Sequence, residues 1–213
     1  MTKPVPDNPP SLAHWRRSIT EMYTNVRLSK DPISGWHKLL AARNHLFKVH
    51  AQSPLPPEIR GSFDQLQYYP YETSFRVIGN VDNAVKQEEF VIELADDGLL
   101  RLMRIAAVHF ELAGQSAQLN LYWVQGYGGG LFLPFKDQTN RKETFGGGRY
   151  LYDTIKGVDL GVNESEILLD FNFAYNPSCA YDVRWVCPLA PQENDLNLAV
   201  LAGEKRFLAS NGD

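Results

Sequence analysis

The loop at residues 136–144 carries charged side chains that could hold a small anion. Lys136 ends the apolar stretch LFLPF, and Arg149 begins the next one, RYLYDTI. If the two stretches pair as neighbouring strands, these cations meet at one edge of a sheet, where a carboxylate or a bound anion must compensate their repulsion. Asp137 and Glu143 are the carboxylates within the loop. If they point away from the cations, we expect an anionic ligand to bind there.

The same loop also has a structural interpretation, which the sequence leaves open. Asp137 and Thr139 can close a turn through bonds from their side chains to the backbone, and Arg149 can pair with a carboxylate of the loop. The glycines at 146–148 can permit left-handed turns or present amides to an anion; the first role is favoured because no Lys-Ser or Lys-Thr follows them. In the ligand-binding interpretation, Tyr150 adds a hydroxyl donor.

A second group of polar residues lies in the C-terminal part of the chain. Asp170 and Asn172 alternate with apolar residues, so a strand places both on one face, where burial requires a fixed hydrogen-bond network. Asn176 precedes the proline that ends this stretch, and it either holds the following loop or lines a pocket. Glu193 and Asn194 follow an extended, proline-containing segment and are expected at the rim of the sheet, bonded to strand amides or facing a ligand.

The two cysteines, Cys179 and Cys187, lie eight residues apart, which is not the Cys-x-x-Cys spacing of zinc ribbons or redox dithiols. They can be inert thiols, a local disulfide, half of a metal site or a nucleophile. No metal is expected, because all five histidines lie upstream without ligand-like spacing. Since no base can be assigned to a nucleophile, inert or disulfide-bonded cysteines are the preferred interpretation, and no catalytic residue is identified.

The N-terminal part of the chain predicts two helices. Ser11 is a candidate N-cap, and the apolar residues after it recur at spacings of three and four: Leu12, Trp15, Ile19, Met22 and Val26. A second helix is expected over residues 34–49, with Trp36, Leu39, Leu40, Leu46 and Phe47 facing inward. The prolines at 54, 56 and 57 then end the helical part of the chain.

Beyond residue 68 the apolar period changes to two, which is typical of strands. The expected strands cover residues 88–94, 99–112, 117–124, 131–135, 149–155 and 166–173. Turn residues at 96–98 and 114–116 join the first three into successive hairpins. Short antiparallel strands of this kind predict a mainly β protein, either an antiparallel sandwich or a partly open β-barrel, with the two helices packed on one end or face.

The composition fits a single domain over residues 1–213, with a disordered lead-in at 1–10, a helical segment at 11–50, and a β core with an irregular C-terminal wrap at 63–206. The net charge of −4 and the scattered basic residues argue against a nucleic-acid partner. No apolar run reaches the roughly 18 residues of a membrane span, and no signal-peptide core is present. We therefore expect a cytoplasmic protein without a membrane partner.

Several motifs resemble an uncharacterised prokaryotic family defined as a domain of unknown function. They are LF-x-PF-x-D-x-T, Gly-Arg-Tyr-Leu, Asp-Phe-Asn-x-Ala-Tyr-Asn-Pro, Cys-Pro-Leu-x-Pro-x-Glu-Asn and a final Ala-Gly-Glu, spread over about residues 68–205. The family commonly has a glycine shortly after the Thr, where this chain has Asn140-Arg141. Since Asn tolerates the left-handed conformation, we expect Asn140 to keep the turn.

Two classes of function are consistent with these residues. In the preferred one, a β-barrel or sandwich binds a small anionic metabolite through Lys136, Arg149 and Tyr150. The ligand then lies beside Asn172, Asn176 and Asn194. In the alternative, the same scaffold carries an enzyme: a hydrolase with Asp170 or Glu193 as general acid or base, or a flavin-dependent oxidoreductase similar to split-barrel enzymes. The sequence assigns no cofactor. A yellow colour in the purified protein would favour the flavin.

The predicted architecture can be checked by far-UV circular dichroism. Because period two dominates residues 88–173 and only two helices precede it, we expect a spectrum with mainly β signal and a helical minority. A spectrum dominated by helix would contradict the architecture.

Overall fold

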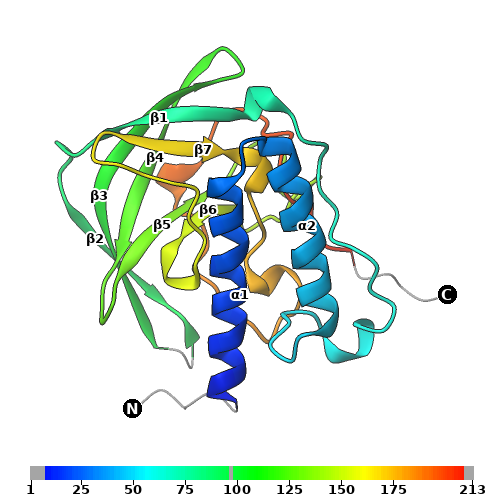
Figure 1. Ribbon diagram of the computed structural model, residues 1–213. Coiled ribbons are helices and arrows are strands. Elements are labelled where there is room, and N and C mark those ends of the chain that lie inside the picture. The colour runs from blue at the N-terminus through cyan, green and yellow to red at the C-terminus, as the bar shows by residue number, and fades with distance from the viewer. Residues whose placement is uncertain (1–7, 96–97, 209–213) are drawn as a thin grey trace.

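A computed structural model of the protein describes residues 8–95 and 98–208. It begins with two helices, α1 (Pro9–Leu28) and α2 (Pro32–Val49), which lie side by side (Figure 1). The predicted cap of the first helix was wrong, because Asn8 and not Ser11 is the N-cap: its side chain accepts the Ser11 amide at 3.0 Å. The helix therefore starts on two prolines, which suit a first turn whose amides have no helical acceptors. Most of the lead-in expected at 1–10 lies outside the described residues.

In the part of the chain that the structure describes, seven strands follow the helices and form one sheet. They are β1 (Arg76–Asp82), β2 (Glu88–Glu93), β3 (Leu99–Leu112), β4 (Gln115–Val124), β5 (Gly130–Phe135), β6 (Arg149–Asp153) and β7 (Glu166–Asp170). The order across the sheet is β6-β5-β4-β3-β1-β7, with β2 paired to the first half of β3, and every strand pair is antiparallel. The sheet curls into a half-barrel, so of the two predicted architectures the partly open barrel is confirmed (Figure 1).

The helices pack on the end of the half-barrel formed by the turns after β6 and β7. Trp36 of α2 donates its indole N–H to the Asn172 carbonyl at 3.1 Å. Gly157, with φ of +85°, lies so close to α1 that a Cβ there would be 2.3 Å from Thr20 Oγ1. Only glycine satisfies both the left-handed backbone and this close approach. Among the described residues, neither helix has the apolar composition that crossing a bilayer requires.

Two strand predictions needed correction. β1 was not predicted, because it contains Gly79 and exposes Ile78, and its place is set by pairing with β3 and β7, which lie far away in the sequence. β7 ends at Asp170 and does not continue to residue 173. Residues 171–173 instead form the 3-10 turn η5 (Phe171–Phe173), since the Asp170 carboxylate accepts the Asn172 amide at 3.2 Å.

Residues 174–208, here called the C-terminal wrap, complete the half-barrel and contain no strand among these described residues. Asn194 attaches the wrap to the sheet. The Asn194 side chain is fully buried. Its Oδ1 accepts the Asn120 amide at 2.8 Å, and its Nδ2 donates to the carbonyls of Asn120 at 2.9 Å and Pro134 at 2.7 Å. The predicted bonds to strand backbone are therefore found, and they use both the oxygen and the nitrogen of the Asn194 side chain.

We expect Asn194→Ala to destabilise the protein by about 3 kcal/mol, because three buried backbone groups lose their partner at once. Urea denaturation followed by tryptophan fluorescence measures the loss. Asn197→Ala is the matched control, since Asn197 is exposed and should change stability by no more than about 0.5 kcal/mol. Equal losses in the two variants would show that Asn194 does not anchor the wrap.

Candidate functional site

The predicted loop site contains a buried ion pair. β5 and β6 are neighbours, and Phe135 lies opposite Arg149, so the expected convergence of the strand ends is found. Arg149 Nη2 lies 2.8 Å from Asp137 Oδ2, and both side chains are fully buried. The guanidinium also donates to the backbone carbonyls of Val200 at 3.1 Å, Glu204 at 3.3 Å and Ala202. The terminal nitrogens of Arg149 therefore bind protein groups, while its Nε has no hydrogen-bond partner, and this arrangement differs from the predicted grip on an external anion.

The rest of this loop is held together internally. Thr139 donates its amide to Asp137 Oδ1 at 2.8 Å, and its hydroxyl lies 2.8 Å from that of Thr144. Lys136 is half-buried, and its backbone amide donates to the Asn194 carbonyl at 2.8 Å. The left-handed residue is Arg141, with φ of +69°, and not the expected Asn140. Asn140 instead caps the turn by accepting the Asp137 amide at 2.6 Å.

Asp170 and Asn172 form a second internal cluster, as their predicted hydrogen-bond network requires. Both are 1% exposed. Asp170 Oδ2 accepts the Tyr71 hydroxyl at 2.8 Å, and Asn172 Nδ2 donates to Asp170 Oδ1 at 2.9 Å. Asn172 also exchanges two hydrogen bonds with the backbone of Glu72, each of 2.9 Å. Burial raises the pKa of Asp170, although these donors and Arg76 oppose the shift.

Of the remaining predicted residues, the structure brings Tyr150 and Asn176 together. Both line a cavity of about 60 Å³ between α1, α2 and the loop after η5. Tyr150 also donates its hydroxyl to the Pro188 carbonyl, which attaches the wrap to β6. Glu193 is exposed in the short turn η7 (Gln192–Asn194) and lies outside this cavity.

This cavity is bordered by buried polar groups that the protein leaves unsatisfied. In the described part of the chain, five buried side-chain polar atoms have no hydrogen-bond partner. Three of them belong to residues lining the cavity: Arg43 Nε, Tyr175 Oη and Asn176 Oδ1. An unpaired buried polar atom costs roughly 1–3 kcal/mol, so three around one cavity are unusual in a folded protein. Such atoms can be satisfied by water or by a bound molecule with polar groups of its own.

Arg43 is fixed beside the cavity by a buried ion pair with Glu204. Arg43 Nη2 lies 3.1 Å from Glu204 Oε2, and the two side chains are 8% and 1% exposed. Glu204 also accepts the hydroxyl of Tyr68 at 3.2 Å, that of Tyr181, and the Asn176 amide at 3.1 Å. Burial raises the pKa of both tyrosines well above their ordinary value, so both remain hydroxyl donors.

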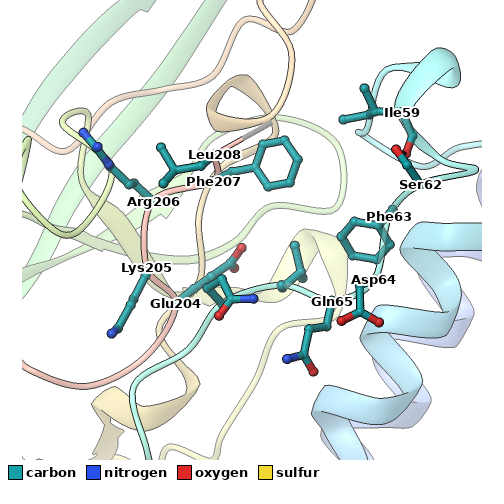
Figure 2. A pocket seen from close by; sticks show the side chains of 12 residues that line it. Ile59, Ser62, Phe63, Asp64, Gln65, Glu204, Lys205, Arg206, Phe207 and Leu208 are labelled. Atoms are coloured by element: carbon teal, nitrogen blue, oxygen red, sulfur yellow. Dashed lines mark hydrogen bonds between the residues drawn. The ribbon is translucent and has the colours of Figure 1, made fainter. Parts of the chain in front are cut away.

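The Arg43–Glu204 pair separates this cavity from a second one. The second cavity has a volume of about 150 Å³ and lies between residues 59–67 and residues 204–208. Figure 2 shows Glu204 beside it, with Phe63 on one wall and Phe207 on the other. The side chains of Lys205 and Arg206 point away from Glu204 in this view. The ion pair thus forms a polar partition between the cavities.

Lys156 supplies a second cation at the edge of the smaller cavity. It lies in the 3-10 turn η4 (Thr154–Lys156) and is 54% exposed, and its Nζ is 3.2 Å from Asp153 Oδ2. The attraction of Asp153 raises the pKa of Lys156 above its ordinary value, so the amine is charged at neutral pH. Since exposed ion pairs are weak, this amine can turn toward a ligand at little cost.

Sequence reasoning missed Arg43, Lys156 and Glu204. A signal for Arg43 was present, because it follows Trp36 and Leu39 and precedes Leu46 and Phe47 at helical spacing, on a face that is otherwise apolar. A basic residue on such a face has to find a buried partner. Glu204 ends the Ala-Gly-Glu motif, but its partner lies 161 residues away, and the sequence alone cannot match the two.

The role of the Arg149–Asp137 pair can be tested by comparing one and two substitutions. Arg149→Met should destabilise the protein by about 3–5 kcal/mol, because Asp137 then remains charged and buried without a partner. Adding Asp137→Asn removes that charge and keeps an oxygen for the Thr139 amide, so the double variant should regain at least about 1 kcal/mol in urea denaturation. A double variant no more stable than the single one would show that the charge of Asp137 is not the reason for the loss.

Comparison with known proteins agrees with the resemblance found in the motifs. Residues 61–205 match the family described as "Protein of unknown function (DUF1684)". The solution NMR structure of an uncharacterised protein from Haloarcula marismortui is 34% identical, with a TM-score of 0.58; the match covers 81% of this chain and 95% of that one. No curated protein matches the chain. The chain therefore belongs to the DUF1684 family.

Proposed function

We propose that this protein binds a small anionic molecule in the cavity lined by Arg43, Lys156, Tyr175 and Asn176. The observation that carries the proposal is the set of three unpartnered polar atoms on residues lining this cavity. The proposal keeps the anionic ligand predicted from the sequence. It moves the site from the loop at 136–144 to the space between the helices and the C-terminal wrap.

The unpartnered atoms favour a ligand with both acceptor and donor groups. Arg43 Nε carries a proton at all physiological pH values, and burial holds the pKa of Tyr175 well above its ordinary value, so both residues can donate. Carboxylate oxygens are good acceptors for such a pair. The Asn176 Nδ2 already donates to the Lys205 carbonyl at 2.7 Å. The group left over is the Oδ1 oxygen, which can only accept a hydrogen bond. A small hydroxy acid offers a carboxylate for the first two groups and a hydroxyl for the third.

Volume and charge further limit the ligand. A cavity of about 60 Å³ holds a few water molecules or a compound of similarly few heavy atoms. Arg43 and Lys156 already have Glu204 and Asp153 as carboxylate partners, so the local charge is balanced before any ligand binds. A single negative charge is therefore better tolerated than two. We expect a monocarboxylate to bind more tightly than phosphate.

The positions of the candidate acid and base residues favour binding over catalysis. Asp170 is enclosed by Tyr71 and Asn172, and Glu193 is exposed in η7. Neither residue lines the cavity, so neither can transfer a proton to a molecule bound there. The buried Glu204 accepts from two tyrosines and an arginine, which suits a positioning role.

Thermal shift measurements on wild-type protein and on Tyr175→Phe test this site. Glycolate and lactate should raise the melting temperature, whereas their neutral amides should not, because the amides lack the charge that Arg43 and Lys156 attract. Without ligand, Tyr175→Phe should keep or gain stability, by up to about 1 kcal/mol, because it removes a buried hydroxyl that has no partner. The variant should lose most of the shift caused by the ligand.

Tyr152→Phe is the matched control, since the Tyr152 hydroxyl is also buried but lies 2.8 Å from the Gly161 carbonyl and 2.7 Å from that of Leu168. It should cost roughly 1 kcal/mol and leave the shift caused by the ligand unchanged. The proposal is wrong if no small monocarboxylate stabilises the wild type, or if Tyr175→Phe retains the full shift. A high-resolution structure in which only water contacts the three atoms, with these acids present, would also contradict it.

A further inference from the structure

Cys179 and Cys187 are brought into contact by the fold. Cys179 lies in the turn η6 (Ser178–Ala180), and the chain reverses over the next residues so that the Cys179 amide donates to Cys187 Sγ at 3.3 Å. Both are free thiols and both are half-buried. The structure therefore shows two free thiols, neither of them fully buried, in place of the disulfide that was one of the two favoured interpretations.

The surroundings of Cys187 favour its thiolate form. The hydrogen bond from the Cys179 thiol lowers the pKa of Cys187 most, the Cys179 amide adds to this, and the positive charge of Lys156 acts in the same direction against the opposing effect of burial. The pKa of Cys179 is raised, because its thiol is the donor to Cys187. The two cysteines thus differ in character: one is suited to attack as a thiolate, and the other retains its proton.

Cys187 is also accessible to a reactant. It lines a groove of about 640 Å³ between β2 and the extended segment at residues 187–191. Phe90, Ile92 and Leu189 make much of this lining apolar, and Glu89 and Glu93 also line the groove. Among residues 8–95 and 98–208, β2 pairs with β3 alone, so its other edge borders the groove. An apolar molecule of modest size can therefore approach the Cys187 sulfur.

The wall that carries Cys187 is held in place. Tyr150 donates its hydroxyl to the Pro188 carbonyl, and the Ala190 amide donates to the Gly147 carbonyl at 3.3 Å. These two bonds hold the chain just after Cys187 in place. The Cys187 side chain then has Cys179 on one side and the groove on the other. A nucleophile, a nearby second thiol and access for a substrate occur together at one point of the fold.

We propose that Cys187 and Cys179 form a thiol pair that reduces organic hydroperoxides and closes to a disulfide. The Cys187 thiolate attacks the terminal oxygen of the hydroperoxide, a sulfur–oxygen bond forms, and the oxygen–oxygen bond breaks. The alkoxide leaves and takes a proton from water, which gives an alcohol and the sulfenic acid of Cys187. Cys179 then loses its proton to solvent and attacks Cys187 Sγ. The sulfur–sulfur bond replaces the sulfur–oxygen bond, and hydroxide leaves as water.

In this reaction two thiols are oxidised and one hydroperoxide is reduced, and an added dithiol restores the starting state. The Cys179 amide lies 3.3 Å from Cys187 Sγ and a hydrogen bond links the two thiols, so the second step joins groups that the fold already holds side by side. The reaction uses neither Arg43 nor Tyr175, and it stands independently of the binding proposed above.

The experiment treats the reduced full-length protein with cumene hydroperoxide and follows free thiols and intact mass. We expect the loss of both thiols and of two hydrogen atoms, a disulfide between Cys179 and Cys187 within one chain, and recovery with dithiothreitol. The rate at pH 7 should exceed that of free cysteine by about twofold, because the larger thiolate fraction of Cys187 outweighs its lower intrinsic nucleophilicity.

Two variants separate the roles of the cysteines. Cys179→Ser should stop at the sulfenic acid, which dimedone traps on Cys187. Cys187→Ser should react no faster than free cysteine. The proposal is overturned if both variants react alike, or if dimedone labels Cys179 instead. Should either variant fail to fold, the wild type alone decides: thiols that react no faster than free cysteine, or a disulfide that joins two chains, would overturn it.

Discussion

The closure of the half-barrel depends on the hydrogen bonds that the buried guanidinium of Arg149 donates. Arg149 lies at the start of β6 and joins this strand to two other parts of the chain. Asp137 connects it to the loop after β5, and the carbonyls of Val200, Ala202 and Glu204 connect it to the C-terminal wrap. The wrap forms no strand, so its carbonyls would otherwise be buried without donors. One planar group with several N–H donors resolves this where a lysine could not. Gly148, with φ of +94°, allows the chain to enter β6 at this point, where a Cβ would lie 2.6 Å from the Phe135 carbonyl.

A second arginine holds the same C-terminal segment from the other side and thereby creates the cavity. Arg149 binds the backbone of residues 200–204, while Arg43 binds the side chain of Glu204. The wrap is therefore held between the sheet and α2 by two cations on opposite sides. Arg43 makes its bonds to Glu204 and Tyr181 through Nη2, so its Nε is left without a partner. The unpartnered Arg43 Nε is thus a consequence of how the wrap is fastened to α2.

Local patterns predicted most of the fold, whereas pairing over long distances decided what they missed. Alternation of apolar residues located six strands, but β1 contains Gly79 and is defined by its partners β3 and β7. The site shows the same division. Asp137 and Arg149 were recognised as a potential pair because they flank adjacent strands. Arg43 and Glu204 were not, because 161 residues separate them and only the folded chain shows which polar atoms are left without partners.

The loop between Tyr175 and Cys187 connects the two proposed sites physically. It starts at the cavity with Tyr175, passes Tyr181, whose hydroxyl donates to Glu204, and ends at the groove with Cys187. A disulfide between Cys179 and Cys187 would close this loop covalently and leave fewer conformations to the backbone around Tyr181. Tyr181 donates a hydrogen bond to Glu204, and Glu204 in turn orients Arg43. Oxidation at one end of the loop would therefore act on the segment that holds Glu204 and, through it, Arg43, although neither thiol lines the smaller cavity.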